Sequence, residues 1–427
     1  MNSPAPLEQQ EAATRWRSRF LAGIAAAALT AGALAAVTAS TAAHATTGTW
    51  STETIAGMSV RLYTPTSAGT LGDGRALMIN LHGCVQKAKD LQANGNWAAA
   101  ADAYGMVVAI PDAPNGGVVL GCWDYYDTNH SSSSPARHDD NLRDLAQTLT
   151  ARASLGIDES QVYISGLSSG GGEAMVMGCL FPNLFAGVGI NAGPTVGTTS
   201  GQIGTVATDE KTATSTCRKF ANTGAEGFQT QVTSVVYGSN DTTVAPGYDT
   251  LNGKVMAGLY GATSSTQFSL TGLSGTNTQG AGTQYSDTQG PRASVIQNTG
   301  LGHNWPAGAG SGGTYISANS IDYPAYVTKF FFDNNRRVDR SITPTPSPTP
   351  APTVTPTPSP TPTTTPTGCT TATNAEHKAA GRATGYGANP YNPYYAVGSL
   401  GYMGLGDATV SNLSPLAGGW SVVASCG

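Results

Sequence analysis

The chain contains Val162-Tyr163-Ile164-Ser165-Gly166-Leu167-Ser168-Ser169-Gly170-Gly171-Gly172, an apolar run that ends in a Gly-x-Ser-x-Gly pattern. A strand that turns directly into a helix strains the residue at the turn, and small residues two positions to either side let the neighbouring backbone pass. Gly166 and Gly170 occupy those two positions, and Glu173 to Leu180 is compatible with a helix. The pattern therefore predicts that Ser168 is a nucleophile. A glycine-rich loop is the alternative, because the chain has 54 glycines.

Further apolar runs on both sides of this turn predict buried strands. Continuous apolar runs are typical of strands covered on both faces, whereas surface helices repeat every ~3.6 residues. The predicted strands are Ser59 to Tyr63, Ala76 to Leu81, Met106 to Ile110, Gln161 to Ser165, Thr233 to Tyr237 and Ala293 to Ile296. The predicted helices are Trp97 to Tyr104, Asp139 to Ala153 and Tyr323 to Phe332. This alternation indicates an α/β fold with a mostly parallel sheet and helices on both faces.

The first 45 residues have the pattern of a secretory signal peptide. Three arginines between residues 15 and 19 precede an alanine-rich apolar run, and Ala43-His44-Ala45 fits the cleavage pattern. We therefore expect residues 1–45 to be removed and the mature chain to be secreted and extracellular. The alternative is a membrane anchor, although the many alanines make this run weakly hydrophobic.

The six cysteines also fit an oxidising compartment. Pairing each cysteine with its neighbour in sequence keeps every bridge within one predicted domain, although order alone proposes pairs without proving them. The expected disulfides are Cys84–Cys122, Cys179–Cys217 and Cys369–Cys426. A cysteine metal site is the rival interpretation, but the sequence has no CxxC or CxxH spacing.

The charge pattern argues against a nucleic acid partner. The formal net charge is −5 at pH 7, and no basic stripe is present to neutralise a phosphate backbone. Charged residues make up 11% of the chain, well below the ~25% of average soluble proteins. The surface must therefore be covered largely by small polar residues, which suits contact with a neutral, insoluble material. We expect a monomer with no membrane contact once the signal peptide is removed.

Composition divides the rest of the chain into three parts. Residues 46–340 are long enough for one α/β domain with a buried core. Residues 341–368 are almost entirely Thr, Pro and Ser, which predicts an extended linker because such a segment cannot bury a core. Residues 369–427 form a small module, and its expected Cys369–Cys426 bridge would tie its ends together. The module contains no catalytic pattern, so we interpret it as a binding module.

A serine nucleophile needs a histidine base and a carboxylate that orients the base, and in an α/β-hydrolase fold these follow in the order Ser, Asp, His. Only His303 follows Ser168 within the predicted domain. The other histidines lie in the signal peptide (His44), before the serine (His82, His130, His138) or beyond the linker (His377). A structural histidine in the glycine-rich loop Gly300-Leu301-Gly302-His303 is the alternative.

The expected acid is Asp241, because it follows the predicted strand Thr233 to Tyr237, and ligand-facing groups collect at the carboxyl ends of such strands. A turn-forming role is the alternative for Asp241. The other candidate acids between the serine and the histidine are Asp209, Asp249 and Asp287.

Backbone amides are expected to stabilise the oxyanion. One comes from the residue after the nucleophile, Ser169, and a second from the loop after an early strand, where Leu81-His82-Gly83-Cys84 stands. The Cys84 amide is our candidate, and a bridge to Cys122 would brace its loop. His82 is expected to orient this loop rather than to bind a metal.

Four aromatic residues are candidate substrate contacts. Trp123 and Trp305 are expected to line the catalytic cleft, and Tyr394 and Trp420 to lie against substrate in the terminal module. Core packing is an equally good interpretation of each residue.

Taken together, HGC at 82–84, GLSSGG at 166–171, GSNDTTV at 238–244 and GHNWP at 302–306 closely resemble the type 1 catalytic domain of extracellular poly(3-hydroxybutyrate) depolymerases. The resemblance spans most of residues 50–335 and implies the triad Ser168, Asp241 and His303 with Cys84 at the oxyanion hole. Feruloyl and acetylxylan esterases share a similar set of motifs, so the resemblance is less specific for the substrate than for the fold and the triad.

The terminal module favours the depolymerases. Residues 374–383 resemble the N-x-x-H-x-x-A-G-R-A stretch of their substrate-binding domains, and the order of signal peptide, catalytic domain, linker and binding domain is also theirs. The plain Thr-Pro linker and the insert Ala388 to Tyr395 depart from the family pattern. The resemblance implies a secreted serine esterase that cleaves poly(3-hydroxybutyrate) without a metal or organic cofactor. The alternatives are a carbohydrate-side esterase and a polymer-adhering protein with a relic hydrolase domain.

Overall fold

The structure is a computed structural model that describes residues 48–341, 368–385, 393–397, 399, 402–416 and 419–426. The predicted signal peptide lies outside these residues, as do most of the predicted linker and residues 386–392. The chain separates into two compact units, with the division after Thr345. Within the described residues, none of the helices is long and apolar enough to cross a bilayer.

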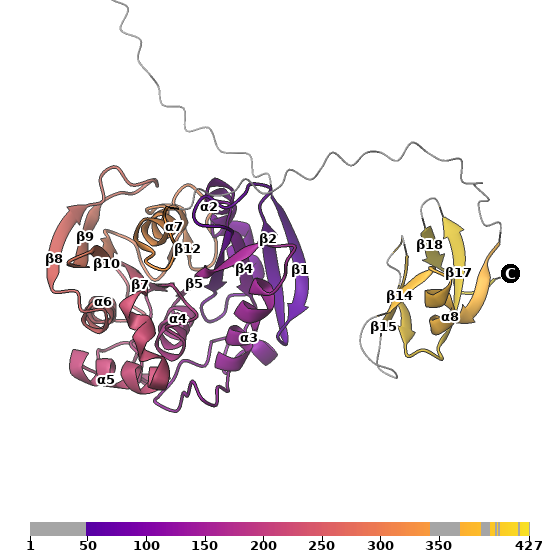
Figure 1. The fold of residues 1–427 in the computed structure, drawn as a ribbon, viewed down its shortest axis with the longest axis horizontal. Coiled ribbons are helices and arrows are strands. Elements are labelled where there is room, and N and C mark those ends of the chain that lie inside the picture. The colour runs from indigo at the N-terminus through magenta and orange to yellow at the C-terminus, as the bar shows by residue number, and fades with distance from the viewer. Residues whose placement is uncertain are drawn as a thin grey trace, which may run out of the picture. The chain divides into compact units, whose positions relative to one another are not determined.

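The first unit is built on one ten-stranded sheet, in the order β1-β2-β4-β3-β5-β6-β7-β10-β9-β8 (Figure 1). Its strands are β1 (Thr49–Ile55), β2 (Met58–Thr64), β3 (Arg75–Leu81), β4 (Val107–Pro111), β5 (Ile157–Leu167), β6 (Gly187–Asn191), β7 (Val232–Gly238), β8 (Ser264–Ser269), β9 (Gly280–Asp287) and β10 (Gly290–Asn298). The six strands from β4 to β10 pair in parallel. β1, β2, β9 and β8 extend the two edges in antiparallel pairing. This order is that of an α/β-hydrolase fold, as the sequence predicts.

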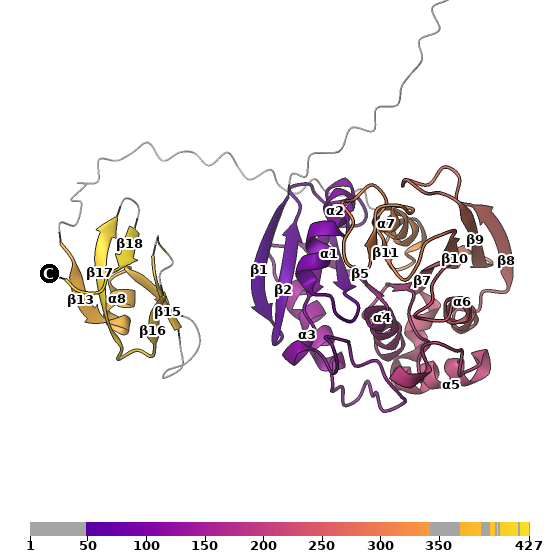
Figure 2. The same cartoon turned by 180° about the vertical axis from the view of Figure 1, so that it is seen from behind.

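Helices cover both faces of the sheet, as Figures 1 and 2 show. They are α1 (Ala88–Asn94), α2 (Trp97–Tyr104), α3 (Asp139–Thr150), α4 (Ser169–Leu180), α5 (Glu210–Ala221), α6 (Gly247–Leu259) and α7 (Tyr323–Asn334). One hydrophobic cluster lies under α3 to α6, and a second lies under α1, α2 and α7. The central strands are therefore buried on both faces, which is why they read as continuous apolar runs.

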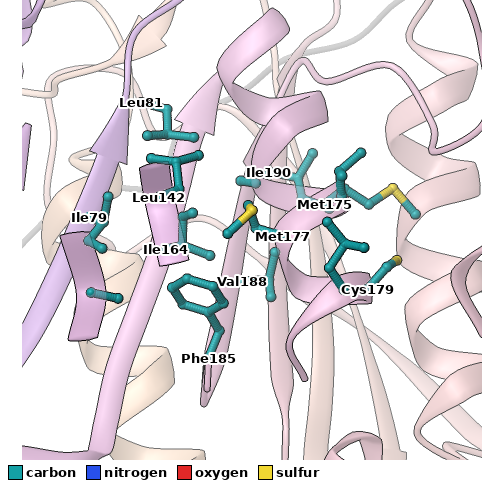
Figure 3. Close-up of a cluster of buried hydrophobic side chains, with 14 of the residues drawn as sticks. Ile79, Leu81, Leu142, Ile164, Met175, Met177, Cys179, Phe185, Val188 and Ile190 are labelled. Atoms are coloured by element: carbon teal, nitrogen blue, oxygen red, sulfur yellow. The ribbon is translucent and has the colours of Figure 1, made fainter. Parts of the chain in front are cut away.

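Side chains of one strand alternate between these two clusters. In β3, Ile79 and Leu81 join the first cluster, whereas Met78 joins the second, as the two-residue repeat of a strand requires. Figure 3 shows the first cluster, which includes Ile79, Leu81, Leu142, Ile164, Met175, Met177, Cys179, Phe185, Val188 and Ile190. This packing holds α4 against β5 and so fixes the turn between them.

The parallel strands bring distant parts of the chain to one edge of the sheet. β3 ends just before His82, β5 just before Ser168, β7 three residues before Asp241 and β10 five residues before His303. Because these strands are parallel, their carboxyl ends lie along the same edge. Four loops that are far apart in sequence therefore meet there.

The second unit contains two three-stranded sheets, β13-β17-β18 and β14-β15-β16, with one short helix. Its elements are β13 (Thr370–Thr373), α8 (Asn374–Ala379), β14 (Ala383–Gly385), β15 (Pro393–Ala396), β16 (Tyr402–Leu405), β17 (Val410–Leu416) and β18 (Gly419–Val422). Its buried cluster is small, with five members among the described residues. The disulfide Cys369–Cys426 joins its two ends, a link that suits a module with so little core.

Candidate active site

Ser168 stands at the turn between β5 and α4 in a strained backbone conformation, with φ 59° and ψ −120°. The turn is tight: a Cβ atom on Gly166 would lie 2.3 Å from the carbonyl oxygen of Gly170, and one on Gly170 would lie 2.5 Å from that of His82. The Ser168 amide donates to the Asn191 carbonyl at 2.8 Å. Strain of this kind is characteristic of a nucleophile held above the edge of a sheet.

His303 and Asp241 form a hydrogen-bonded pair beside this serine. The distance from His303 Nδ1 to Asp241 Oδ2 is 2.7 Å; the Asp241 side chain is fully buried and the His303 side chain is 9% exposed. The other carboxylate oxygen of Asp241 accepts the amides of Thr243 and Val244 at 2.8 and 3.0 Å. Asp241 can only accept when ionised, so His303 donates from Nδ1 and its Nε2 is free to accept a proton.

The other candidate acids have different partners. Asp287 binds Arg292 and Arg336, which lowers its pKa. Asp209 caps α5 by accepting the Thr212 amide. Asp249 is fully buried, and burial together with the nearby Asp241 charge raises its pKa well above the ordinary value. Asp241 is the acid that contacts the histidine.

Ser168 and His303 line the same cleft, which has a volume of about 340 Å³. Two loops form much of its wall: the segment after β3, from Gly83 to Gln86, and the segment from Val119 to Tyr126. Among the described residues that line it, His303 is the single imidazole and no carboxylate is present. The lining therefore lacks the set of oxygen and nitrogen donors on which protein metal sites depend.

Two backbone amides in this cleft are the candidate oxyanion donors. In the loop after β3, Gly83, Val85 and Gln86 each donate their amide to a protein acceptor. Within the described residues, the Cys84 amide has no such acceptor. Ser169 is the first residue of α4, so its amide lacks an intrahelical partner and lies at the positive end of the helix dipole.

All three disulfides expected from sequence order are present in the structure. Cys84–Cys122 links the two loops that form the cleft wall. A hydrogen bond from the Val85 amide to the Leu120 carbonyl, 2.7 Å long, runs beside it. The candidate oxyanion donor therefore lies on a loop that is tied covalently to its neighbour.

His82 is buried below this loop and both of its ring nitrogens have partners. Nδ1 donates to the Gly83 carbonyl at 2.8 Å, and Nε2 accepts the Ala113 amide at 3.2 Å. Burial lowers the pKa of His82, which keeps the ring neutral. Its contacts are those of a residue that orients the loop.

The two tryptophans predicted to line the cleft do not do so. Trp305 is fully buried, packs against Trp97 and donates its indole N–H to the Gly95 carbonyl at 3.0 Å. Trp123 is also fully buried, between the rings of His82 and His138. Both belong to the core, where large aromatic side chains bury the most apolar area.

The aromatic residues that do line the cleft are Tyr125, Tyr126 and Tyr315, and none of them is among the residues predicted from the sequence. Tyr125 and Tyr126 lie close behind Cys122, so the predicted disulfide was a usable signal for them. Tyr315 is placed by a loop after β10, and its ring lies 6.0 Å from that of His303. No feature of the sequence near Tyr315 predicts that this residue lies in the cleft.

A partly buried network of charged side chains supports the segment that carries Tyr125 and Tyr126. Arg137 binds Asp124, and His130 binds Asp139 at 2.9 Å. Glu173 of α4 is fully buried beside them, and burial, followed by the negative charge of Asp139, raises its pKa well above the ordinary value. Arg137 Nη1 donates to the Tyr126 carbonyl at 3.0 Å, and His130 Nε2 lies 3.1 Å from the same carbonyl, so these side chains hold the segment that carries the two tyrosines.

In the second unit, the prediction that Tyr394 contacts substrate is wrong. Tyr394 is 2% exposed, and its hydroxyl donates to Asp407 at 2.7 Å. It belongs to the small core, because a module of this size needs its large side chains inside. Trp420 is half-buried, with the Arg382 guanidinium 5.7 Å from its ring centroid, so part of its surface stays open.

The known proteins to which the chain is similar include a depolymerase and acetylxylan esterases. The chain is 41% identical over 304 residues to a poly(3-hydroxybutyrate) depolymerase from Ralstonia pickettii, an alignment that covers 68% of this chain and 61% of that protein. It is 26% identical to acetylxylan esterase A from Aspergillus ficuum, over 58% of this chain and 82% of the relative. A solved acetyl xylan esterase from Aspergillus awamori aligns with a TM-score of 0.49 and 20% identity, over 60% of this chain and 94% of that structure. Residues 58–257 match the family described as "Esterase PHB depolymerase".

Proposed function

We propose that the mature chain is a secreted carboxylic ester hydrolase that cleaves poly(3-hydroxybutyrate). The observation that carries this proposal is the combination of Ser168, His303 and Asp241 with an apolar surface around the cleft. The similarity to the Ralstonia pickettii depolymerase supports the choice of substrate.

The mouth of the cleft carries four exposed apolar side chains, which we call the apolar rim: Val85, Val119, Leu120 and Tyr315, exposed by 54, 61, 72 and 43%. Three of them, Val85, Leu120 and Tyr315, have positive φ angles, which cost backbone strain in residues with a Cβ atom. Water-exposed apolar groups gathered at one place mark an interaction surface. An aliphatic polyester can lie on the apolar rim.

The triad acts through an acyl-enzyme route. His303 takes the Ser168 proton at Nε2 while Asp241 holds the ring, and Ser168 Oγ attacks the ester carbonyl. The oxyanion accepts hydrogen bonds from the Cys84 and Ser169 amides. His303 then protonates the departing hydroxyl group. A water molecule gives a proton to His303 as its oxygen attacks the acyl carbonyl. His303 then returns this proton to Ser168 Oγ, and the bond from Ser168 to the acyl group breaks to release the hydroxyacyl product.

The remaining parts serve a substrate that cannot diffuse. Residues 1–45 direct export, residues 46–340 form the catalytic domain, residues 341–368 form a linker and residues 369–427 bind polymer. Tethering the catalytic domain to a solid raises its concentration at the surface. Trp420, which keeps an open face in the second unit, is a candidate polymer contact.

An acetylxylan or feruloyl esterase is the second candidate function, favoured by the similarity to acetylxylan esterase A. The apolar rim argues against it, because hydrated polysaccharide offers few apolar partners.

The test is clearing of a poly(3-hydroxybutyrate) granule suspension by the mature protein, with Ser168→Ala as the control and acetylated xylan and a feruloyl ester assayed in parallel. We expect clearing that Ser168→Ala abolishes. Intact granules with rapid release of acetate or ferulate would assign the chain to plant-cell-wall esters.

A further inference from the structure

Gln86 makes contacts that the mechanism above does not use. Its side chain is 2% exposed and bridges two loops. Its Oε1 accepts the Gly83 amide at 2.8 Å, and its Nε2 donates to the Thr314 carbonyl at 2.6 Å. The two partners are 231 positions apart in sequence numbering, and each belongs to a segment that lines the cleft.

At its first end, Gln86 orients the peptide that carries the candidate oxyanion donor. The Gly83 carbonyl accepts His82 Nδ1 at 2.8 Å and the Gln86 amide at 3.3 Å. That carbonyl and the Cys84 N–H belong to one planar trans peptide, so they point in opposite directions. Holding the Gly83 residue through both its N–H and its C=O therefore fixes the direction of the Cys84 N–H.

This peptide lies next to the nucleophile. A Cβ atom on Gly83 would be 3.3 Å from Ser168 Cβ. A rotation of the Gly83–Cys84 peptide would therefore turn a carbonyl oxygen, in place of a donor, toward the reacting centre. Such a rotation removes one of the two oxyanion hydrogen bonds.

At its second end, Gln86 holds the segment beside His303. Thr314 precedes Tyr315, whose backbone is strained at φ 53° and whose ring meets the His303 ring edge-on at 6.0 Å. The Tyr315 carbonyl accepts the Trp305 amide at 2.8 Å. Gln86 therefore connects the oxyanion loop with the loop that flanks the base.

We propose that Gln86 is a positioning residue that links the oxyanion loop to the Thr314–Tyr315 segment and so aligns the Cys84 amide with Ser168 and His303. The proposal rests on the proposed esterase activity. It predicts that losing this side chain lowers kcat and leaves KM nearly unchanged, because the oxyanion exists only in the transition state and the intermediates that resemble it.

The variants are Gln86→Met, which fits the same space without polar atoms, and Gln86→Glu. The matched control is Gln231→Met. Gln231 is fully buried and also bridges backbone groups, since its Nε2 donates to the Gly178 and Phe185 carbonyls. It lies just before the amino end of β7, whereas Ser168 follows the carboxyl end of the parallel strand β5. Gln231→Met therefore costs comparable buried hydrogen bonds without touching the cleft.

The assay is steady-state hydrolysis of p-nitrophenyl butyrate by the mature full chain, with thermal unfolding of each variant measured alongside. We expect Gln86→Met to lose about 10- to 100-fold in kcat with KM within twofold. Binding of a boronic acid that forms a tetrahedral adduct with Ser168 should weaken by a similar factor. Gln231→Met should lower the unfolding temperature and retain wild-type kcat per folded molecule.

Gln86→Glu supplies an independent readout. A carboxylate still accepts the Gly83 amide but repels the Thr314 carbonyl, whereas the protonated acid can donate to that carbonyl. The ratio of variant to wild-type kcat should therefore rise as the pH falls, which support of the fold alone does not predict. Wild-type kcat in Gln86→Met, or a pH-independent ratio in Gln86→Glu, would overturn the proposal. A wild-type chain without esterase activity would instead overturn the proposed function.

Discussion

Asp241 is held from two sides, since one carboxylate oxygen lies 2.7 Å from His303 Nδ1 and the other accepts the amides of Thr243 and Val244. The two backbone amides therefore hold the carboxylate in place independently of its contact with the histidine. A carboxylate fixed in this way selects one tautomer of the ring and stabilises the imidazolium that forms during attack.

Replacing this acid should disable catalysis without disturbing binding. In Asp241→Asn the amide group can donate to His303 Nδ1 and so favours the wrong tautomer, and we expect kcat to fall by about 10⁴ with KM little changed. The measurement is p-nitrophenyl butyrate hydrolysis. Asp287→Asn, which breaks the pairing with Arg336 and Arg292, serves as the control and should affect stability only. Near-wild-type turnover in Asp241→Asn would mean that another residue is the catalytic acid of the triad.

Two of the disulfides form a matched pair for testing the cleft wall. Cys84–Cys122 and Cys179–Cys217 both span 38 residues, so the chain-entropy estimate gives the same loss of stability for either, about 4 kcal/mol. Replacing each pair by alanines keeps every backbone amide. We expect similar drops in the free energy of unfolding, but a fall in kcat per folded molecule only when Cys84–Cys122 is lost. Equal kcat in the two double variants would show that the bridge does not hold the oxyanion loop.

The strain at Ser168 predicts a stability difference between two inactive variants. Glycine adopts positive φ at little cost, whereas alanine bears the same strain as serine at φ 59°. We expect Ser168→Gly to exceed Ser168→Ala in free energy of unfolding by roughly 1 kcal/mol, the strain relieved minus the greater freedom of glycine in the unfolded chain. Chemical denaturation of both variants measures this difference. A less stable Ser168→Gly would mean that the turn is relaxed.

Asp322 gives the stability of the catalytic domain a pH dependence. Burial raises the pKa of this carboxyl group, which caps α7, from 3.8 to about 6. The folded state thus binds the proton more tightly than the unfolded state, so this contribution is complete below pH 3.8 and is lost as the pH rises through about 6. The loss is on the order of 2 to 3 kcal/mol.

The comparison for that pH dependence is Asp322→Asn, which has no proton to lose. Between pH 4 and about 7, the wild-type free energy of unfolding should fall relative to that of the variant, as measured by urea titrations at several pH values. Parallel curves would mean that Asp322 titrates alike in both states.

Removing the terminal module should separate solid from soluble substrates. A chain that ends at residue 341 retains every described residue of the catalytic cleft. We expect it to lose most of its granule clearing and to retain p-nitrophenyl butyrate hydrolysis, because only the solid requires a tether. Equal losses on both substrates would contradict a tethering role.

The sequence predicts the central strands and the order of the site residues because both depend on local patterns. β6 was missed, although it is fully buried. Its sequence, Gly187-Val188-Gly189-Ile190-Asn191, has glycines where neighbours come close: a Cβ atom on Gly189 would lie 2.6 Å from Ser165 Cβ, and one on Gly187 would lie 2.9 Å from the Phe331 ring. These glycines are explained by contacts with residues elsewhere in the chain, so the local sequence does not identify the strand.

The positions of Trp123 and Trp305 could not be predicted from the sequence either. A large aromatic residue fits both a core and a cleft, and its own neighbours in sequence do not distinguish the two. Trp305 directly follows the loop of His303, yet its indole points to Gly95. By contrast, the low number of histidines allowed His303 to be singled out by elimination, and the structure brings its ring against Asp241.

The parallel order of the sheet also predicts a late return of activity during folding. The base follows β10, which pairs with β7 across a long stretch of intervening chain, and such long-range pairings form slowly. We therefore expect the return of esterase activity during refolding to follow the pairing of β10, because a partly folded chain that holds Ser168 in place still lacks His303, the proposed proton acceptor. By the same reasoning, we expect a secreted chain to have no esterase activity until its sheet is complete.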